Sequence, residues 1–225
     1  MNRAAKQILW VTLFAIAMAY LESAVVVYLR RVYGIGDLIL QVPPFDPQIA
    51  AIELGRELAT LVMLLSVGWI AASHLQSRIG FAVISFGIWD VFYYVWLRVM
   101  IGWPQSLLDP DLLFLIPLPW WGPVLSPVLI ALLMVAGGVV AVIKDHQGIE
   151  LHPRGYEWLC LILGVLIMLY AFMADALRAF PADAVTLSLL RPSAFLWQVY
   201  LPGLALTVFF VWRLSRQAKS ASSGN

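Results

Sequence analysis

Residues 124–143 read VLSPVLIALLMVAGGVVAVI, a run without a single charged side chain. An α-helix rises about 1.5 Å per residue, so a run of this length can cross the ~30 Å hydrocarbon core of a bilayer. A second uncharged run of similar length covers residues 194–212. Two such runs in one chain predict a membrane protein rather than a soluble domain with an apolar core.

The composition of the whole chain agrees with lipid as its surroundings. Of its 225 residues, 62% are apolar and only 12% are charged, and the mean hydropathy is +0.88. Soluble domains are nearer half apolar and a quarter charged, so this chain has too few charges to cover a surface in water. The apolar composition thus predicts membrane lipid as a partner. The net charge of +1, without a basic stripe, predicts no binding of nucleic acid.

Six segments are apolar enough and long enough to span a bilayer. They cover residues 8–29, 49–72, 79–101, 124–143, 158–177 and 194–212. We therefore predict an all-α, polytopic integral membrane helix bundle of about six transmembrane helices. The second segment is the weakest because Glu53, Arg56 and Glu57 fall in its first half. Five spans are the alternative, if that segment lies partly outside the bilayer.

The basic residues outside the spans set the orientation, because cytoplasmic segments are enriched in Lys and Arg. With the N-terminus inside, the inner segments hold Arg3, Lys6, Arg78, Lys144, Arg154, Arg213, Arg216 and Lys219, and the outer ones hold Arg30, Arg31, Arg98, Arg178 and Arg191. This excess predicts two cytoplasmic termini, in a bacterial cytoplasmic membrane. Residues 1–215 are predicted to form a single transmembrane domain, and residues 216–225 a disordered cytoplasmic tail.

Residues 102–123 between the third and fourth spans read GWPQSLLDPDLLFLIPLPWWGP. Proline breaks this stretch too often for a spanning helix, yet it is too apolar for a loop in water. We predict an interfacial or re-entrant segment, since irregular backbone at membrane depth must be covered by protein or line a wet cavity. The alternative is a flat loop on the lipid headgroups, anchored by Trp103, Trp120 and Trp121.

Charged residues inside the predicted spans gather toward the outer face in this orientation. Each intramembrane charge costs at least ~2.5–3.5 kcal/mol on insertion scales, which makes such a residue a candidate for function. Glu53, Arg56 and Glu57 are spaced by three and four residues and so share one face of the second span. Arg30 and Arg31 end the first span, where we expect them to reach the headgroups.

The third and fifth spans show similar spacing. Asp90, Tyr94 and Arg98 step by four residues along the third span, and Asp175 and Arg178 lie one turn apart at the end of the fifth. If these faces turn toward one another and toward the acids of the first two spans, they form a polar pocket that opens outward.

We predict that this pocket binds or acts on an amphiphile such as a lipid, an isoprenoid or a quinone-like molecule. Arginines would hold a polar or anionic head and aromatic side chains would flank the tail. If a reaction occurs, Glu57 or Asp90 is the predicted proton donor or acceptor. The predicted binding residues are Glu22, Glu53, Arg56, Tyr93, Tyr94, Arg98, Trp103, Trp121, Asp175 and Arg178.

Two other interpretations stay open at this point. The same carboxylates could form the relay of a proton- or ion-coupled transporter, or the ion pairs could be purely structural in a non-catalytic subunit or assembly factor of a membrane complex. A metal site is not predicted, because His74, His146 and His152 all fall in inner connections away from the carboxylates. No cofactor is predicted, and whether the protein is an enzyme stays open.

The sharpest structural expectation concerns Arg56. This residue cannot reach water easily from within a span, and a guanidinium has more donors than one carboxylate can accept. We therefore predict an ion pair between Arg56 and a carboxylate of another helix, with Asp90 or Glu22 as the favoured partner.

Overall fold

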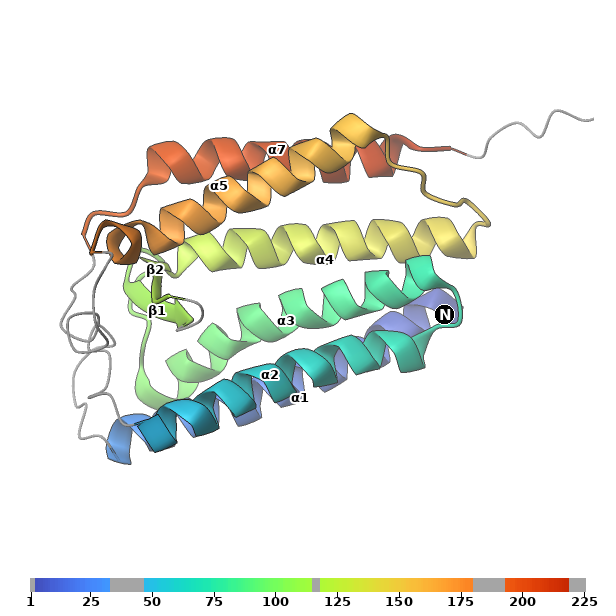
Figure 1. Cartoon of the computed structure of the whole chain (residues 1–225). Helices are drawn as coiled ribbons and strands as arrows, with labels where there is room; N and C mark the ends of the chain where they lie inside the picture. Colours follow the sequence, from blue (N-terminus) through green and yellow to red (C-terminus); the bar gives the residue numbers. More distant parts are fainter. Residues whose placement is uncertain (1–2, 33–46, 115–117, 180–192, 219–225) are drawn as a thin grey trace, which may run out of the picture.

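The computed structural model describes residues 3–32, 47–114, 118–179 and 193–218 (Figure 1). The regular elements of this part of the chain are helices and one antiparallel β-hairpin. The elements are α1 (Arg3–Val32), α2 (Pro47–Ala71), α3 (Leu75–Ile101), β1 (Pro110–Phe114), β2 (Trp120–Pro123), α4 (Leu125–His146), α5 (Gly155–Ala179) and α7 (Trp197–Arg216).

The helices lie side by side and run alternately up and down one axis (Figure 1). The helix α3 packs against α1, α2 and α4, while α7 packs against α5 and α4. The start of α1 and the end of α7 lie at the same end of the bundle, and the hairpin lies at the opposite end (Figure 1). We call these the terminal end and the hairpin end.

Five of the described helices are long and apolar enough to cross a membrane. They are α1, residues Ala51–Ala71 of α2, α3, α4 and α5. The helix α7, which covers the predicted sixth span, is not among them. Large apolar side chains such as Trp10, Tyr28 and Ile70 are exposed on the helices, as contact with lipid requires. The predicted helical architecture is thus confirmed, and five of its helices are compatible with a membrane bundle.

At two crossings, glycines of both helices bring the backbones close together. A Cβ atom added to Gly80 of α3 would lie 3.0 Å from the carbonyl oxygen of Gly138 on α4. One added to Gly164 of α5 would lie 2.7 Å from the carbonyl oxygen of Gly203 on α7. Lipid gives apolar helix faces little reason to associate, so tight van der Waals contact at small residues is what holds such crossings.

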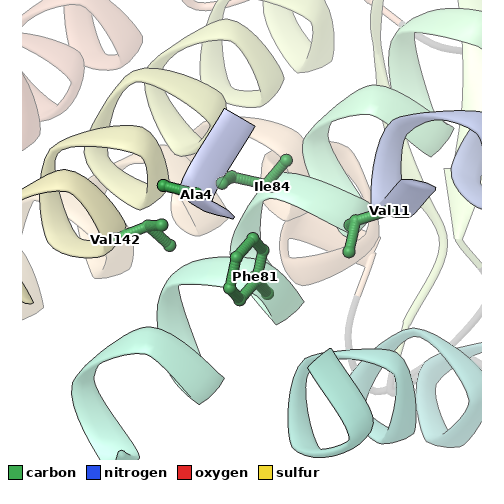
Figure 2. Packing of buried hydrophobic residues seen from close by; sticks show 5 residues of the cluster. All are labelled: Ala4, Val11, Phe81, Ile84 and Val142. Atoms are coloured by element: carbon green, nitrogen blue, oxygen red, sulfur yellow. The ribbon is translucent and has the colours of Figure 1, made fainter. Parts of the chain in front are cut away.

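An apolar cluster surrounds the α3–α4 crossing toward the terminal end. Figure 2 shows its members, which come from α1, α3 and α4: Ala4, Val11, Phe81, Ile84 and Val142. Phe81 and Ile84 are fully buried. Along α3 this cluster lies between Ser77, near the terminal end, and Asp90, nearer the hairpin end. It therefore separates the polar residues of the two ends.

The segment between α3 and α4 contains the hairpin, which the sequence did not predict. Asp111 lies opposite Gly122 and Leu112 opposite Trp121 in the two strands. The strand β2 packs against both α4 and α5. A Cβ atom on Gly122 would lie 2.7 Å from the ring of Phe172, so only glycine fits this contact.

The flat-loop alternative for this segment is wrong for two of its three tryptophans. Trp103 and Trp121 are 5% and 3% exposed, so protein rather than lipid headgroups surrounds them. A buried hairpin also satisfies part of its own backbone through the β1–β2 ladder, which an extended loop at the same depth would leave unpaired.

Candidate functional site

Arg56 is the centre of an ion-pair network between α1 and α2. Its guanidinium pairs with Glu22 of α1, and its Nε donates to Glu53 Oε2 at 2.8 Å. Thr60 Oγ1 donates to Glu22 at 3.3 Å. The Arg56 and Glu22 side chains are 23% and 12% exposed, so water reaches them only in part. The predicted pairing of Arg56 with another helix is confirmed, with Glu22 as the partner.

Asp90, the other partner considered for Arg56, is a half-buried carboxylate on α3. It makes no hydrogen bond or ion pair with any of the described residues, and its charged neighbour is the Asp111 carboxylate of β1. Glu57, in contrast, has Arg56 as a neighbouring cation on α2. Asp90 and Glu57, the two predicted proton carriers, therefore differ in their surroundings. Asp90 lies near another carboxylate, whereas Glu57 lies near a cation.

Asp111 is buried between the hairpin and α3. Its side chain is 2% exposed, and Oδ2 accepts a hydrogen bond from the Tyr94 hydroxyl at 3.1 Å. Burial raises the pKa of Asp111 to about 6, against the nearby Arg30 charge and the Tyr94 hydrogen bond, which lower it. A carboxyl group of this kind exchanges protons near neutral pH.

Three aromatic side chains, Tyr93, Tyr94 and Trp103, pack in a row beside Asp90 and Asp111. The ring centroids of Tyr93 and Tyr94 are 5.1 Å apart, and those of Tyr94 and Trp103 are 6.0 Å apart. The Arg30 guanidinium lies 5.1 Å from the centroid of the Trp103 ring. Tyr93 is within electrostatic range of both Arg30 and Arg56. It therefore links the α1–α2 network to the acids of α3 and β1.

These residues form one group, which we call the polar cluster. Its members are Glu22, Arg30, Glu53, Arg56, Glu57, Thr60, Asp90, Tyr93, Tyr94, Trp103 and Asp111.

Four residues predicted for the pocket lie outside the polar cluster, namely Arg98, Trp121, Asp175 and Arg178. Arg98 is exposed and donates to the carbonyl oxygen of Pro104 at 3.0 Å, which closes the end of α3. Asp175 pairs with Arg178 at 3.3 Å and accepts hydrogen bonds from the backbone and hydroxyl of Ser193, before α7. No contact between Asp175 or Arg178 and the polar cluster occurs among the described residues.

A cavity of about 300 Å³ lies where β2, α5 and the start of α7 meet. Trp121 and Asp175 line it, together with Phe172, Phe195 and Trp197. We call it the α5–α7 cavity. The residues predicted for a single pocket thus fall into two separate groups, because α5 packs against α7 and β2 rather than against α1, α2 or α3.

Arg30, Thr60 and Asp111 belong to the polar cluster although the sequence did not mark them as site residues. Arg30 was expected to reach the headgroups, but it is half-buried and stacks on Trp103. For Asp111 a signal existed, since a carboxylate in a long apolar stretch is as costly there as in a span. Thr60 carries no sequence signal that separates it from a packing residue.

A second polar network closes the terminal end of the bundle. Asp145 accepts a hydrogen bond from Ser77 and lies 3.3 Å from Nδ1 of His74. Glu157 is buried and pairs with Nε of Arg213 at 2.7 Å. Each of these two carboxylates binds side chains of a neighbouring helix or of the residue that precedes it, so the network holds the helix ends together. Neither carboxylate lacks a partner as Asp90 does.

Within the described ranges, no group of three or more His, Cys, Asp or Glu side chains is placed to hold a metal ion. Comparison of the chain with protein-family models, with curated proteins and with solved structures gives no match. The functional argument therefore rests on the chemistry of the polar cluster itself.

Proposed function

We propose that this protein is an integral membrane protein that binds an amphiphile at the polar cluster. The observation that carries the proposal is Asp90, a half-buried carboxylate with no hydrogen bond or ion pair to the described residues and with Asp111 as its charged neighbour. An unpartnered carboxylate in apolar surroundings is costly. A bound head group that donates a hydrogen bond would supply the missing partner.

The engaged arginines indicate which head group fits best. Arg56 already pairs with Glu22 and Glu53, and Arg30 stacks on Trp103. An anionic head would have to displace one of these contacts, and it would meet a cluster with five carboxylates against two arginines. An uncharged head that donates hydrogen bonds, such as an isoprenoid alcohol or a quinol, therefore fits better than a phosphate.

The aromatic residues and the second acid support the same interpretation. The rings of Tyr93, Tyr94 and Trp103 offer flat apolar walls, with a hydroxyl group on each tyrosine and an N–H on the indole, the usual lining of sites for small amphiphiles. If the head changes its protonation state, Asp90 and Asp111 are the groups that would exchange the proton, since Asp111 is the charged neighbour of Asp90.

Mass spectrometry of the lipids that stay bound through purification in a mild detergent tests the proposal. We expect the wild-type protein to retain a hydroxyl-bearing amphiphile, and Asp90→Asn to reduce its occupancy roughly tenfold, the effect of losing one hydrogen bond to a charged group. Asp109→Asn is the matched control, because within the described part of the chain the Asp109 carboxylate accepts hydrogen bonds from backbone amides of its own turn, away from the polar cluster. Equal retention by both variants would argue against the site.

A proton-coupled transporter is the second candidate. The Ser85 hydroxyl and the Trp89 indole lie on α3 between the polar ends of the molecule, buried and without a hydrogen-bond partner in the described chain. A transport path needs such groups at mid-depth, although Phe81 and Ile84 fill the same stretch. Proton flux into liposomes that Asp90→Asn abolishes would favour this candidate over simple binding.

A purely structural role in a larger complex is the third possibility from the sequence. It predicts a stoichiometric protein partner in the same mild-detergent preparation and no specific amphiphile. The lipid analysis and a gel of the purified sample therefore distinguish it from the first candidate in one experiment.

A further inference from the structure

We propose that the amphiphile reaches Asp90 from the side, with a single hydrocarbon tail that lies along α3 between α2 and α4. This inference rests on the function proposed for the polar cluster, and it adds the route of entry and the number of tails. It is carried by the face of α3 on which Asp90 lies and by the helices that pack on either side of that face.

Asp90 lies at one end of a row of side chains that stays partly open to the surroundings. Ile79, Val83, Phe86 and Asp90 are spaced by three and four residues and therefore share one face of α3. Ile79 is 49% exposed, and the other three side chains are half-buried. We call these four residues the α3 stripe. At 1.5 Å per residue it is about 16 Å long.

Close contacts on both sides place the α3 stripe between α2 and α4. A Cβ atom on Gly68 of α2 would lie 2.7 Å from the backbone nitrogen of Ala82 on α3. One on Gly87 of α3 would lie 2.8 Å from the side chain of Val135 on α4. Successive residues of a helix turn by about 100°, so the stripe lies between Ala82 and Gly87 around α3. Among the described residues α2 and α4 do not pack against each other, and Figure 1 shows α3 between them.

The hairpin closes the stripe beyond Asp90. One and two turns further along α3, Tyr94 and Leu97 are 5% and 0% exposed, and the Tyr94 hydroxyl donates to Asp111 of β1 at 3.1 Å. In the other direction the stripe stays partly open as far as Ile79. A tail attached to a head group at Asp90 therefore extends toward the terminal end, along α3 and in contact with the lipid.

The width of the stripe fits one tail. Only one side chain per turn of α3 lies between the contacts with α2 and those with α4, and helices in such contact have axes about 8–10 Å apart. A second tail would have to leave the protein surface. The site should therefore bind single-chain alcohols, such as isoprenoid alcohols or quinols, more tightly than diacylglycerol, whose head is also an uncharged hydroxyl group.

The position of Asp90 also argues for an uncharged head. Asp90 lies within α3 rather than at its end, so the head must enter the depth of the helix from the lipid. A charged phosphate pays a large desolvation cost on this route, whereas a hydroxyl group pays much less and regains a hydrogen bond at the carboxylate.

The test uses the full-length protein in nanodiscs with farnesol that carries a diazirine at the far end of its tail. Crosslinked peptides are mapped by mass spectrometry. We expect crosslinks in excess on residues 79–86, and Asp90→Asn should reduce them roughly tenfold, the effect of one hydrogen bond to a charged group. Unlabelled farnesol should compete, while farnesyl methyl ether, which has no donor, and dioleoylglycerol, which has two tails, should each compete about tenfold more weakly.

Two variants obstruct the tail without touching the head group. Val83→Trp places a ring in the middle of the α3 stripe, and Ile79→Trp places one at its exposed end, where no packing has to change. Each should lower the crosslinks on the stripe at least threefold. Val165→Trp is the matched control, because Val165 is 40% exposed on α5, away from the stripe.

The outcomes separate this inference from the proposed function. Crosslinks that depend on Asp90 but lie on α1 or α5 would overturn the route and leave amphiphile binding at the polar cluster intact. Equal competition by farnesol and dioleoylglycerol would overturn the single tail. Labelling that is spread evenly over the exposed helices and unchanged in Asp90→Asn would indicate bulk lipid only, and would overturn both proposals.

Discussion

At the scale of single residues, the polar cluster depends on how each charge inside the bundle finds a partner. Arg56 is held between a carboxylate of its own helix, Glu53, and one of a neighbouring helix, Glu22. The second contact fixes the position of α1 against α2, two helices that otherwise touch little. An intramembrane ion pair of this kind is strongly coupled, since either charge alone lacks a counter-ion.

A double-mutant cycle on Arg56 and Glu22 measures this coupling. Arg56→Met leaves Glu22 uncompensated, so we expect it to lower the free energy of unfolding in detergent by roughly 3–5 kcal/mol. Arg56→Met combined with Glu22→Gln should lose clearly less than the sum of the two single changes. Arg31→Met, on the exposed part of α1, is the control, with a change within about 0.5 kcal/mol. Additive losses would show that the pair is not coupled.

The hydrogen bond from Tyr94 to Asp111 has a consequence for pH. The pKa of Asp111 is raised from 3.8 to about 6, so the folded protein keeps this proton between those pH values while the unfolded chain releases it. The contribution of Asp111 to stability therefore falls as pH rises from about 4 to about 6 and is constant above that. Tyr94→Phe removes a donor that favours the ionised form, and the pKa should rise further.

Thermal unfolding between pH 4 and pH 8 checks this prediction. In Tyr94→Phe we expect the fall in stability to continue to higher pH than in the wild-type protein, and the infrared carboxyl band should titrate with it. Asp111→Asn should remove both signals, which assigns them to this residue. A profile of Tyr94→Phe that superimposes on the wild-type profile would contradict the role of the hydrogen bond.

At the scale of elements, the two glycine crossings hold α3 to α4 and α5 to α7. Small residues matter more here than in a soluble bundle, because lipid competes equally well for apolar side chains. The helix α7 is also attached near the hairpin end by the Tyr200 hydroxyl, which donates to the carbonyl oxygen of Ser126 at 2.6 Å. This bond, together with β2, connects the α5–α7 pair to the rest of the molecule.

Substitution of Gly203 tests the α5–α7 crossing. The Cβ atom of Gly203→Ala would lie 2.8 Å from the carbonyl oxygen of Gly164, so the helices must separate. We expect a loss of about 1–3 kcal/mol in unfolding free energy. Gly55→Ala is the control, since nothing lies within 4 Å of a Cβ atom there, and its better helix propensity should leave stability unchanged or up to about 1 kcal/mol higher. Equal effects of the two changes would mean that close approach does not stabilise this crossing.

At the scale of the whole molecule, the alternation of helix direction places the terminal end and the hairpin end on opposite faces of any membrane that the bundle spans (Figure 1). The polar cluster and the α5–α7 cavity both lie toward the hairpin end. The excess of Lys and Arg at the other end predicts that the hairpin end faces outward.

Cysteine labelling of intact cells tests both spanning and orientation. Cys160, the single native cysteine, is first replaced by alanine. In that background a membrane-impermeant maleimide should label Gln105→Cys, at the exposed turn before the hairpin, without permeabilisation. Glu150→Cys, in the exposed connection between α4 and α5, should react only after permeabilisation. The reverse pattern would overturn the orientation, and labelling of both sites in intact cells would overturn spanning.

The long apolar helices could be predicted from the sequence, because segment length and apolar composition are local properties and a segment in lipid must satisfy its own backbone. The pairing of Arg56 with another helix could also be predicted, because the position of a charge within an apolar segment is read from that segment alone. Helical spacing gave the depth of Asp90 and Asp175, but depth does not say which helices are neighbours. That was decided by packing: α5 lies against α7 and the hairpin, so Asp175 joins a separate cavity. Asp111 joins the cluster through the hydrogen bond that it accepts from Tyr94 of α3, a contact that depends on how the hairpin packs against that helix.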